Sequence, residues 1–209
     1  INHLLSFGMD YWWRKYAVKQ LNNNPQKILD IATGTADFAI SIAKHTKSKI
    51  IGIDISKSMI RVGEKKIKKK KLDERIKLLV EDAEKLPFKN MEFDGITAGF
   101  GVRNFENLEK GLQEMYRVLK KDGLILILEP SKPNTFPIKQ IYNLYFQYFL
   151  PNFGKLISKD KHAYSYFKNS VNSFPTGKEF LKKLNKAGFK ESKLIPLTFG
   201  IVNLYIAIK

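Results

Sequence analysis

The chain has 209 residues, 44% hydrophobic and 12% aromatic, so it can bury a core and is neither disordered nor collagen-like. It has no cysteine, which excludes disulfides, thiolate metal sites and a cysteine nucleophile and fits the reducing cytoplasm. Its three dispersed histidines give no metal-ligand spacing, and no apolar run approaches the roughly 20 residues that span a bilayer. We therefore expect a cytoplasmic protein without a metal site.

The formal net charge is +17, and 32 of the 37 basic residues are lysine. Proteins that read a nucleic-acid sequence depend on arginine, so we expect no specific nucleic-acid partner. Two interpretations of the lysines stay open: a bias toward A/T-rich codons, and peripheral contact with an anionic membrane at its inner face. A lysine-rich binder of membranes or nucleic acid, without catalysis, is the non-enzyme alternative.

Apolar runs and turn residues predict alternating strands and helices along the first two thirds of the chain. The strands are predicted at 27–31, 49–55, 76–80, 93–100 and 124–130. The helices are predicted at 10–21, 36–45, 57–70 and 107–120, the last ended by KKDG at 120–123 and the third capped by Ser56. This alternation is typical of a doubly wound, mostly parallel α/β sheet.

The last third changes character, because aromatic residues become frequent and prolines interrupt the pattern. It predicts a helical segment at 136–168, a helix at 176–187 ended by Gly188, and two final strands at 189–196 and 199–208. We therefore expect one domain over 1–209 with a seven-stranded, mostly parallel sheet. We expect residues 134–172 to form a helical, aromatic-rich insertion on the substrate side of the sheet, before the last two strands. Its aromatic residues either pack on the sheet or form an apolar mouth for a hydrophobic ligand.

The segment LDIATGTADFAI at 29–40 is predicted to form a strand, a turn containing Gly34 and a helix. Open α/β sheets bind ligands at the carboxyl ends of their strands. Asp54 ends the next strand 20 residues after Gly34, where an acid can accept both hydroxyls of a ribose. Asp82 and Ala83 follow the third strand, and there they would meet the exocyclic amine and ring of an adenine. The sequence therefore predicts an adenosine-binding site.

The acidic residues of the loop favour one adenosine cofactor over another. The dinucleotide motif needs three glycines, but with Gly34 in the middle the other two positions hold Ala32 and Asp37. Asp37 would repel a pyrophosphate at the start of the helix. S-adenosylmethionine has no phosphate and carries an ammonium and a sulfonium, which tolerate acids such as Asp30 and Asp37. We expect S-adenosylmethionine.

Six blocks of the sequence carry a resemblance that covers nearly the whole chain. They are LLSFGMDYWWRK at 4–15, LDIATGTAD at 29–37, IDISKSMIRVGEKK at 53–66, the block from EDAEKLPF to ILEPSKP at 81–133, YFLPNFG at 148–154 and SFPTGKEFLKKLNKAGF at 173–189. On these blocks the chain resembles the class I methyltransferases, and among them the ubiquinone/menaquinone biosynthesis C-methyltransferases. The family's usual pattern reads G-T-G-D and E-F-S-x-P, and this chain departs from it at Ala36, in place of glycine, and at Pro130.

The resemblance implies which residues contact the cofactor and the substrate. Thr35, Asp54, Asp82 and Ala83 match positions that contact S-adenosylmethionine, Asp30 and Gly34 lie in the same loop, and Gly99 stands where many relatives carry a serine near the cofactor. Arg103 and Asn104 match an Arg-Asn pair beside the quinol ring. The implied activity is S-adenosylmethionine-dependent C-methylation of a prenylated quinol precursor. Demethylmenaquinol is the favoured substrate; the equivalent ubiquinone step and another small oxygen or nitrogen acceptor stay open, as does a homodimer.

The reaction itself needs a group that stabilises a phenolate. An aromatic carbon becomes a good nucleophile when a neighbouring hydroxyl loses its proton, so the site needs a proton acceptor and a positive charge. Arg103 supplies the charge but is a poor base, and we expect Asn104 to orient a water. A surface ion pair is the alternative role of Arg103. Asp10 and His162 are weaker candidates for the base.

Overall fold

The computed structural model describes the chain except residues 1–5, 7, 22–24, 134 and 145–160. Its strands are β1 (Lys27–Ile31), β2 (Lys49–Asp54), β3 (Ile76–Val80), β4 (Phe93–Gly99), β5 (Leu119–Pro130), β6 (Lys190–Leu197) and β7 (Val202–Ile208). Its helices are α2 (Met9–Val18), α3 (Asp37–His45), α4 (Lys57–Lys69), α5 (Leu108–Val118), α6 (Ile138–Leu144), α8 (Lys161–Ser173) and α9 (Lys178–Lys186). Two short 3-10 turns, η1 (Val102–Asn104) and η3 (Thr198–Gly200), follow β4 and precede β7.

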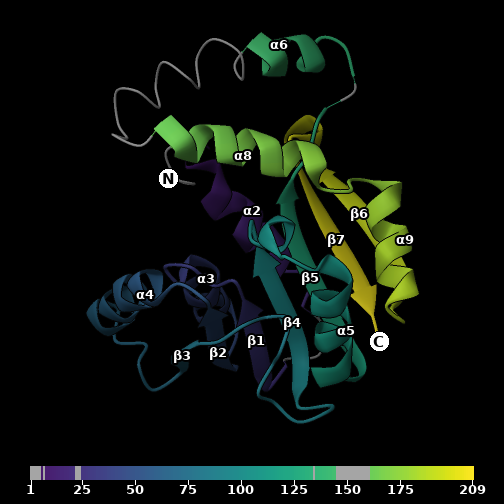
Figure 1. Ribbon diagram of the computed structural model, residues 1–209. Helices are drawn as coiled ribbons and strands as arrows, with labels where there is room; N and C mark the ends of the chain where they lie inside the picture. Colours follow the sequence, from purple (N-terminus) through teal and green to yellow (C-terminus); the bar gives the residue numbers. More distant parts are fainter. Residues whose placement is uncertain (1–5, 7, 22–24, 134, 145–160) are drawn as a thin grey trace.

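The seven strands form one sheet in the order β3-β2-β1-β4-β5-β7-β6 (Figure 1). The first five strands are parallel, and β7 runs antiparallel to both of its neighbours. The strand order reverses between β1 and β4, which is where such sheets bind ligands. The prediction of a doubly wound, seven-stranded, mostly parallel sheet is confirmed.

Helices cover both faces of the sheet. One core cluster joins α2, α3 and α4 to one face, and a second joins α5 and α9 to the other. The first packs side chains such as Trp13 and Phe38 on Ile28 and Ile50, and each cluster contains side chains with no exposed surface. This burial fixes the carboxyl ends of the strands on a rigid base.

The helices of the predicted insertion lie beyond the carboxyl ends of the strands. Figure 1 shows α8 crossing above that edge with α6 farther out, and α8 contacts η1. Tyr142 of α6 is buried. Other aromatic residues of the segment, at 145, 146, 148, 149 and 153, lie outside the described residues. The described helices therefore roof the ligand-binding edge of the sheet.

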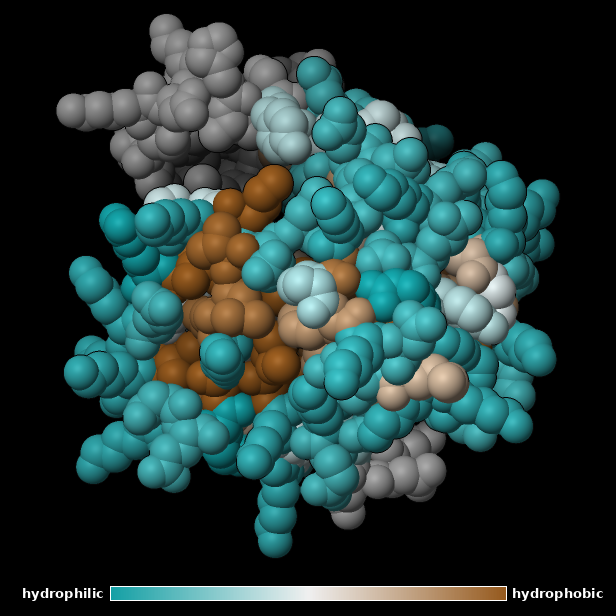
Figure 2. Space-filling model, turned by 60° about the horizontal axis from the view of Figure 1, so that its bottom comes forward, coloured by the Kyte–Doolittle hydropathy of each residue, from teal (hydrophilic) through white to brown (hydrophobic). Residues whose placement is uncertain are grey.

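One part of the sheet carries no helix, because the chain between β3 and β4, residues 81–92, forms only turns. On this face Ile51 of β2 and Leu79 of β3 are only partly buried. Figure 2 shows hydrophobic side chains gathered in one area of the molecule and mostly hydrophilic side chains around it. Because residues 81–92 form no helix, the segment that follows β3 reaches the carboxyl edge of the sheet, where we expect the ligand, as a loop.

Several predicted boundaries were wrong. The helix predicted at 107–120 ends at Val118, and KKDG lies inside β5, which begins at Leu119 because that residue already pairs with Phe93 of β4. The first helix ends at Val18 rather than at residue 21. The last strand begins at Val202, because residues 198–200 form η3. Ser56 caps α4 as predicted, accepting a hydrogen bond from the Met59 N–H.

Candidate active site

A cavity of about 310 Å³ lies at the carboxyl edge of the sheet, within the size range of small-molecule sites. Its lining residues lie at the end of β2 or in the segments that follow β1, β2, β3 and β4. They are Ala32, Ile53, Asp54, Ile55, Glu81, Asp82, Ala83, Glu84, Gly101, Asn104, Phe105 and Glu106. Five of these are acidic and none is basic, in a chain whose net charge is +17. The cavity therefore suits a cationic ligand.

Asp54 ends β2 and connects two turns of the site. Its Oδ2 accepts a hydrogen bond from the Gly34 N–H at 2.8 Å, and its Oδ1 accepts one from the Ser56 N–H at 2.8 Å. Gly34 has a φ of 55°, a left-handed conformation that glycine adopts without strain. A carboxylate accepts about four hydrogen bonds, so Asp54 can hold both turns and still accept ribose hydroxyls.

Asp82 and Ala83 line the same cavity as Asp54, so the structure brings these three predicted cofactor residues together. Asp82 Oδ1 accepts a hydrogen bond from the Glu84 N–H at 2.8 Å, which closes a tight turn. Glu84 in turn accepts one from the Asn107 N–H at 2.8 Å, just before α5. The turn holds Asp82 at the cavity wall.

Helix α5 fixes the rest of this loop. Arg117 donates to the carbonyl oxygens of Leu86 at 2.9 Å and Phe88 at 2.7 Å. Glu114 accepts from the Leu86 N–H at 2.8 Å and from Arg117 at 2.7 Å. The hydrogen bonds from Arg117 lower the pKa of Glu114, so this pair is ionised at neutral pH. The loop beside Asp82 is thus fastened to a helix rather than to a strand.

Asp30 lies near this site but is not a lining residue. Its side chain is fully buried and accepts hydrogen bonds from the hydroxyls of Thr33 at 2.5 Å and Thr97 at 2.6 Å. Burial raises the pKa of Asp30 to about 6, although both hydroxyls act in the opposite direction. Asp30 therefore joins β1 to β4 at the point of strand reversal, and its predicted contact with the cofactor stays a prediction.

The turn that contains Thr35 is tied to α4. The Thr35 hydroxyl donates to Asp37 at 2.8 Å and accepts from Lys66 Nζ at 2.7 Å, and Lys66 also pairs with Asp37 at 2.9 Å. The hydroxyl is thus engaged, which leaves the backbone of Thr35 for the predicted cofactor contact. Lys66 neutralises the charge of Asp37. The acidic residues that line the cavity would therefore repel a pyrophosphate more strongly than Asp37 would. Ala36 has a φ of 64°, which suits the glycine of the family pattern.

Two glycines mark close approaches between chain segments. A Cβ on Gly101 would lie 2.3 Å from the Ala32 Cβ, so only glycine lets the loops after β1 and β4 meet at the cavity. A Cβ on Gly99 would lie 3.0 Å from Phe38, so a side chain there would point toward α3. The predicted place of Gly99 near the cofactor stays a prediction.

Arg103 lies in η1 and forms a buried ion pair rather than a surface one. Its side chain is 7% exposed, and Nη1 donates to Glu129 Oε2 at 2.9 Å and to the carbonyl oxygen of Phe100. The guanidinium carbon lies 5.3 Å from the ring centre of Phe167 in α8. Burial raises the pKa of Glu129, and the Arg103 charge counteracts that rise.

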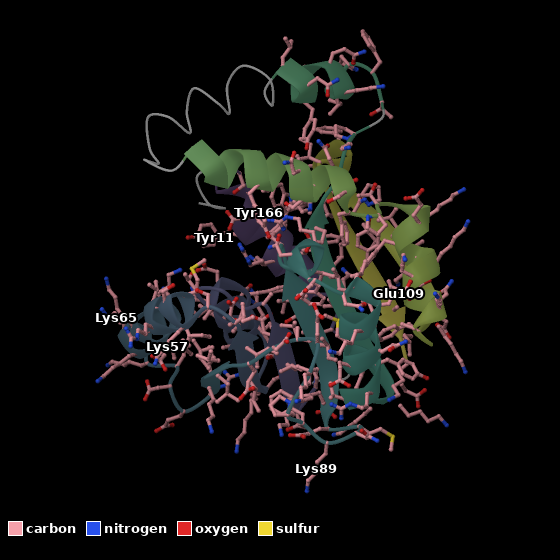
Figure 3. All side chains as sticks on the ribbon, in the orientation of Figure 1. Tyr11, Lys57, Lys65, Lys89, Glu109 and Tyr166 are labelled. Atoms are coloured by element: carbon pink, nitrogen blue, oxygen red, sulfur yellow. The ribbon has the colours of Figure 1, made fainter. Side chains whose placement is uncertain are left out.

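Asn104 is the predicted catalytic residue that lines the cavity. Its Oδ1 accepts a hydrogen bond from the hydroxyl of Tyr166 at 3.3 Å, and Tyr166 is 60% exposed. Figure 3 shows Tyr166 on the side of α8 that faces α2, where Tyr11 lies. Helix α8 thus contacts both members of the Arg103–Asn104 pair.

The two weaker base candidates differ in what the structure says of them. Asp10 is fully buried, pairs with Arg14 and accepts a hydrogen bond from the Ser6 hydroxyl at 2.7 Å. Arg14 lies 5.4 Å from the Phe100 ring centre. This geometry favours a structural role for Asp10. His162 belongs to α8, but its side chain lies outside the described residues.

The site fits S-adenosylmethionine better than a metal or a dinucleotide. In the described part of the chain, no three histidine, aspartate or glutamate side chains gather as metal ligands. Acidic walls oppose a pyrophosphate, whereas they attract a sulfonium and an ammonium and accept hydrogen bonds from ribose hydroxyls. Asp54, Asp82 and Ala83 are the residues that would hold the adenosine.

A doubly wound sheet with such a cavity at its point of strand reversal defines the protein as a class I, S-adenosylmethionine-dependent methyltransferase. A solved S-adenosylmethionine-dependent methyltransferase from Aquifex aeolicus superposes with a TM-score of 0.68 at 16% identity, over 96% of this chain and 92% of that one. The likeness in fold agrees with the class.

Residues 1–209 match the ubiE/COQ5 methyltransferase family, and the chain belongs to it. Among its relatives, the demethylmenaquinone methyltransferase of Bacteroides fragilis is 46% identical over the whole chain and 86% of the relative. The ubiquinone/menaquinone biosynthesis C-methyltransferase UbiE of Geotalea uraniireducens is 42% identical over the whole chain and 90% of the relative. The resemblance stated from the sequence is confirmed.

Several residues that shape the site through tertiary contacts could not be recognised in the sequence. Glu129 ends a strand with an acid, just as Asp30 and Asp54 do, and that shared position was the available signal. Lys66 stands within a lysine-rich helix, and nothing in the sequence distinguishes it from its neighbours. Gly101 belongs to a block that the resemblance covers, whereas Tyr166 lies between two blocks, and no local pattern assigned either residue to the site.

Proposed function

We propose that this enzyme transfers the methyl group of S-adenosylmethionine to a ring carbon of demethylmenaquinol, which loses its ring proton, giving menaquinol, S-adenosylhomocysteine and a proton. The observation that supports this proposal most is the cavity at the point of strand reversal: it is lined by five acidic residues, no basic residue, and Asn104. Relatives such as those of Bacteroides fragilis and Chlorobaculum tepidum carry the name demethylmenaquinone methyltransferase. The ubiquinone step is the alternative, since other relatives carry both pathways in their name.

The residues divide into a cofactor group and a substrate group. Asp54 accepts the ribose hydroxyls, Asp82 accepts from the adenine amine, and Ala83 offers its N–H to the adenine ring. The backbone of Gly34 and Thr35, together with Asp30 and Gly99, completes the cofactor side. Bound S-adenosylmethionine supplies an electrophilic methyl on a positive sulfur.

The substrate group makes the ring carbon nucleophilic. The positive charge of Arg103 stabilises the phenolate that forms when the quinol hydroxyl loses its proton, and Asn104 orients the water that takes the proton up. Alignment of the ring carbon with the methyl group supplies much of the remaining rate enhancement. The segment 134–172 forms the wall beside the prenyl chain.

The prenyl chain of the substrate connects the site to a membrane. No helix in the described residues has the length and hydrophobicity of a bilayer span. Tyr11 and Trp12 of α2 are exposed at 59% and 52%. Helix α2 lies beside α8 at the carboxyl edge of the sheet (Figure 1). We expect peripheral contact with an anionic membrane, through which the quinol reaches the site. A homodimer stays a prediction that sedimentation equilibrium would test.

The test is a reaction with methyl-labelled S-adenosylmethionine and either demethylmenaquinol or the ubiquinone precursor in detergent. We expect labelled menaquinol, with the label on the ring carbon as identified by mass spectrometry. Turnover of the ubiquinone precursor alone would replace the menaquinone assignment. A label on oxygen, or none with either quinol, would overturn the proposed function.

A further inference from the structure

Glu129 is a buried carboxylate directed at the predicted catalytic arginine. It lies at the carboxyl end of β5 and has no exposed side-chain surface. Its Oε2 accepts from Arg103 Nη1 at 2.9 Å, and its Oε1 accepts from the Arg103 backbone N–H at 3.3 Å. One carboxylate thus holds both the main chain and the side chain of Arg103.

The guanidinium of Arg103 is fixed on several sides and yet keeps a free donor. Besides Glu129, Nη1 donates to the carbonyl oxygen of Phe100, and the ring of Phe167 faces the guanidinium. The Nε atom is buried, and among the described residues it has no hydrogen-bond partner. Buried N–H groups are nearly always paired, so this unpaired N–H in a fixed guanidinium lacks a partner that a ligand entering beside Arg103 would supply.

We propose that Glu129 is the positioning residue of the methyl transfer: it fixes Arg103 so that the Nε–H remains available for the quinol oxygen. Without the carboxylate, the guanidinium would keep only the Phe100 carbonyl oxygen and the Phe167 ring as contacts, and the direction of its Nε–H would be less well defined. The same carboxylate compensates the Arg103 charge, which would otherwise be buried alone. This inference rests on the proposed function, because it assigns the acceptor of Nε–H as the oxygen of the quinol.

The alternative hypothesis, that the Arg103–Glu129 ion pair only stabilises the fold, predicts a different result. In that case loss of Glu129 lowers the stability of the fold and leaves the turnover of each folded molecule unchanged. If Glu129 positions Arg103, turnover falls while the affinity for S-adenosylmethionine stays the same, because the pair does not line the cofactor cavity. Turnover per folded molecule therefore separates the two roles.

The kinetic test compares Glu129→Gln and Glu129→Asp with Arg103→Ala and the double variant Arg103→Ala/Glu129→Gln. We expect Glu129→Gln to lower kcat at least tenfold, Arg103→Ala to lower it about a hundredfold, and Glu129→Asp to recover part of the loss. The double variant should be no slower than Arg103→Ala alone. Unchanged kcat in Glu129→Gln, or additive losses in the double variant, would overturn the proposal.

Glu92→Gln is the matched control. Glu92 pairs with Lys27 at 2.6 Å just before β4, at the opposite edge of the sheet from the cavity. Its removal also breaks an ion pair of the fold, but kcat should stay within about twofold of the wild type. An equal loss of kcat in Glu92→Gln and Glu129→Gln would mean that any broken pair slows the enzyme, and would overturn the proposal.

A second measurement needs no turnover. The chain has only five arginines, so the Nε–H signal of Arg103 can be assigned in nitrogen-15-labelled protein by its loss in Arg103→Lys. We expect slow exchange of this N–H with water in the wild type and at least tenfold faster exchange in Glu129→Gln. Equal exchange overturns the positioning role. A fixed Nε–H in a protein that methylates neither quinol overturns only the proposed function.

Discussion

Asp54 divides its two carboxylate oxygens between the Gly34 and Ser56 N–H groups, which belong to the turns after β1 and β2. If Asp54 binds the ribose as we propose, it contributes to the affinity for the cofactor twice: directly, and by ordering the two turns that shape the cavity. Asp30, in contrast, accepts hydrogen bonds from two hydroxyls and is fully buried, away from the lining of the cavity. Two acids at the ends of neighbouring strands therefore have different tasks.

Asp54→Ala should weaken S-adenosylmethionine binding roughly ten- to a hundredfold, because a charged acceptor contributes about 1.5–3 kcal/mol. Isothermal titration calorimetry measures the loss, and the thermal midpoint without ligand shows whether the fold persists. Asp54→Asn keeps one oxygen and should lose less affinity. Wild-type affinity in Asp54→Ala would remove this residue from the cofactor site.

Asp30 should make the fold less stable as the pH rises from about 4 to about 6. Its pKa is raised to about 6 when folded, against 3.8 as its ordinary value, so the folded state favours the protonated form. Stability from this group is therefore fully present below pH 4 and lost as the pH passes 6. The shift corresponds to about 3 kcal/mol.

Urea unfolding at pH 4 and pH 7 tests this expectation. Asp30→Asn cannot ionise, so on going from pH 4 to pH 7 the unfolding free energy of this variant should change more favourably than that of the wild type, by about 2–3 kcal/mol. Other groups titrate equally in both proteins and cancel. An identical pH dependence in the variant and the wild type would show that Asp30 does not carry this shift.

At the scale of elements, the sequence predicted β1 and β3 at their observed residues, because each is an apolar run between turn residues. It placed the end of α5 wrongly, because the pairing of Leu119 with Phe93 competes with the helix and no local pattern records that pairing. The acids after β2 and β3 could be predicted, since parallel strands bring their carboxyl ends to one edge. The Arg103–Glu129 pair could not, because its partners meet only through tertiary packing.

Helix α8 is the element that couples the roof to the site, since Tyr166 bonds Asn104 and Phe167 faces Arg103. Tyr166→Phe removes the hydroxyl and keeps the ring. We expect the KM for the quinol to rise up to about tenfold, because one hydrogen bond contributes about 0.5–1.5 kcal/mol, while S-adenosylmethionine affinity stays the same. Steady-state kinetics with each substrate varied in turn measures both. A change in the affinity for S-adenosylmethionine, with an unchanged KM for the quinol, would assign Tyr166 to the cofactor group of residues instead of the substrate group.

At the scale of the whole molecule, a basic surface encloses an acidic cavity. Figure 3 shows Lys57, Lys65 and Lys89 pointing outward into solvent. Such a surface attracts anionic lipid while the cavity attracts the positive cofactor, so the two attractions do not compete. Turnover measured on lipid vesicles of different charge therefore tests whether the lysines bind a membrane during catalysis.

If the surface charge serves catalysis, turnover of demethylmenaquinol should be faster on anionic than on neutral vesicles at low salt. The advantage should fade as salt rises toward 1 M, where the Debye length falls to about 3 Å. Vesicle flotation measures binding beside turnover. Equal turnover on both kinds of vesicle at every salt concentration would leave codon bias as the explanation of the +17 charge.

The loop that carries Asp82 and Ala83 has a consequence for the lifetime of the bound cofactor. It is fastened by Arg117 and Glu114 of α5, and no helix of its own covers it. Local opening of a segment held by a few hydrogen bonds is much faster than global unfolding, so we expect this loop to be an exit route for the adenosine. Arg117 does not line the cavity. We therefore expect Arg117 to influence the dissociation rate of the cofactor, more than its association rate, through the loop and without touching the cofactor.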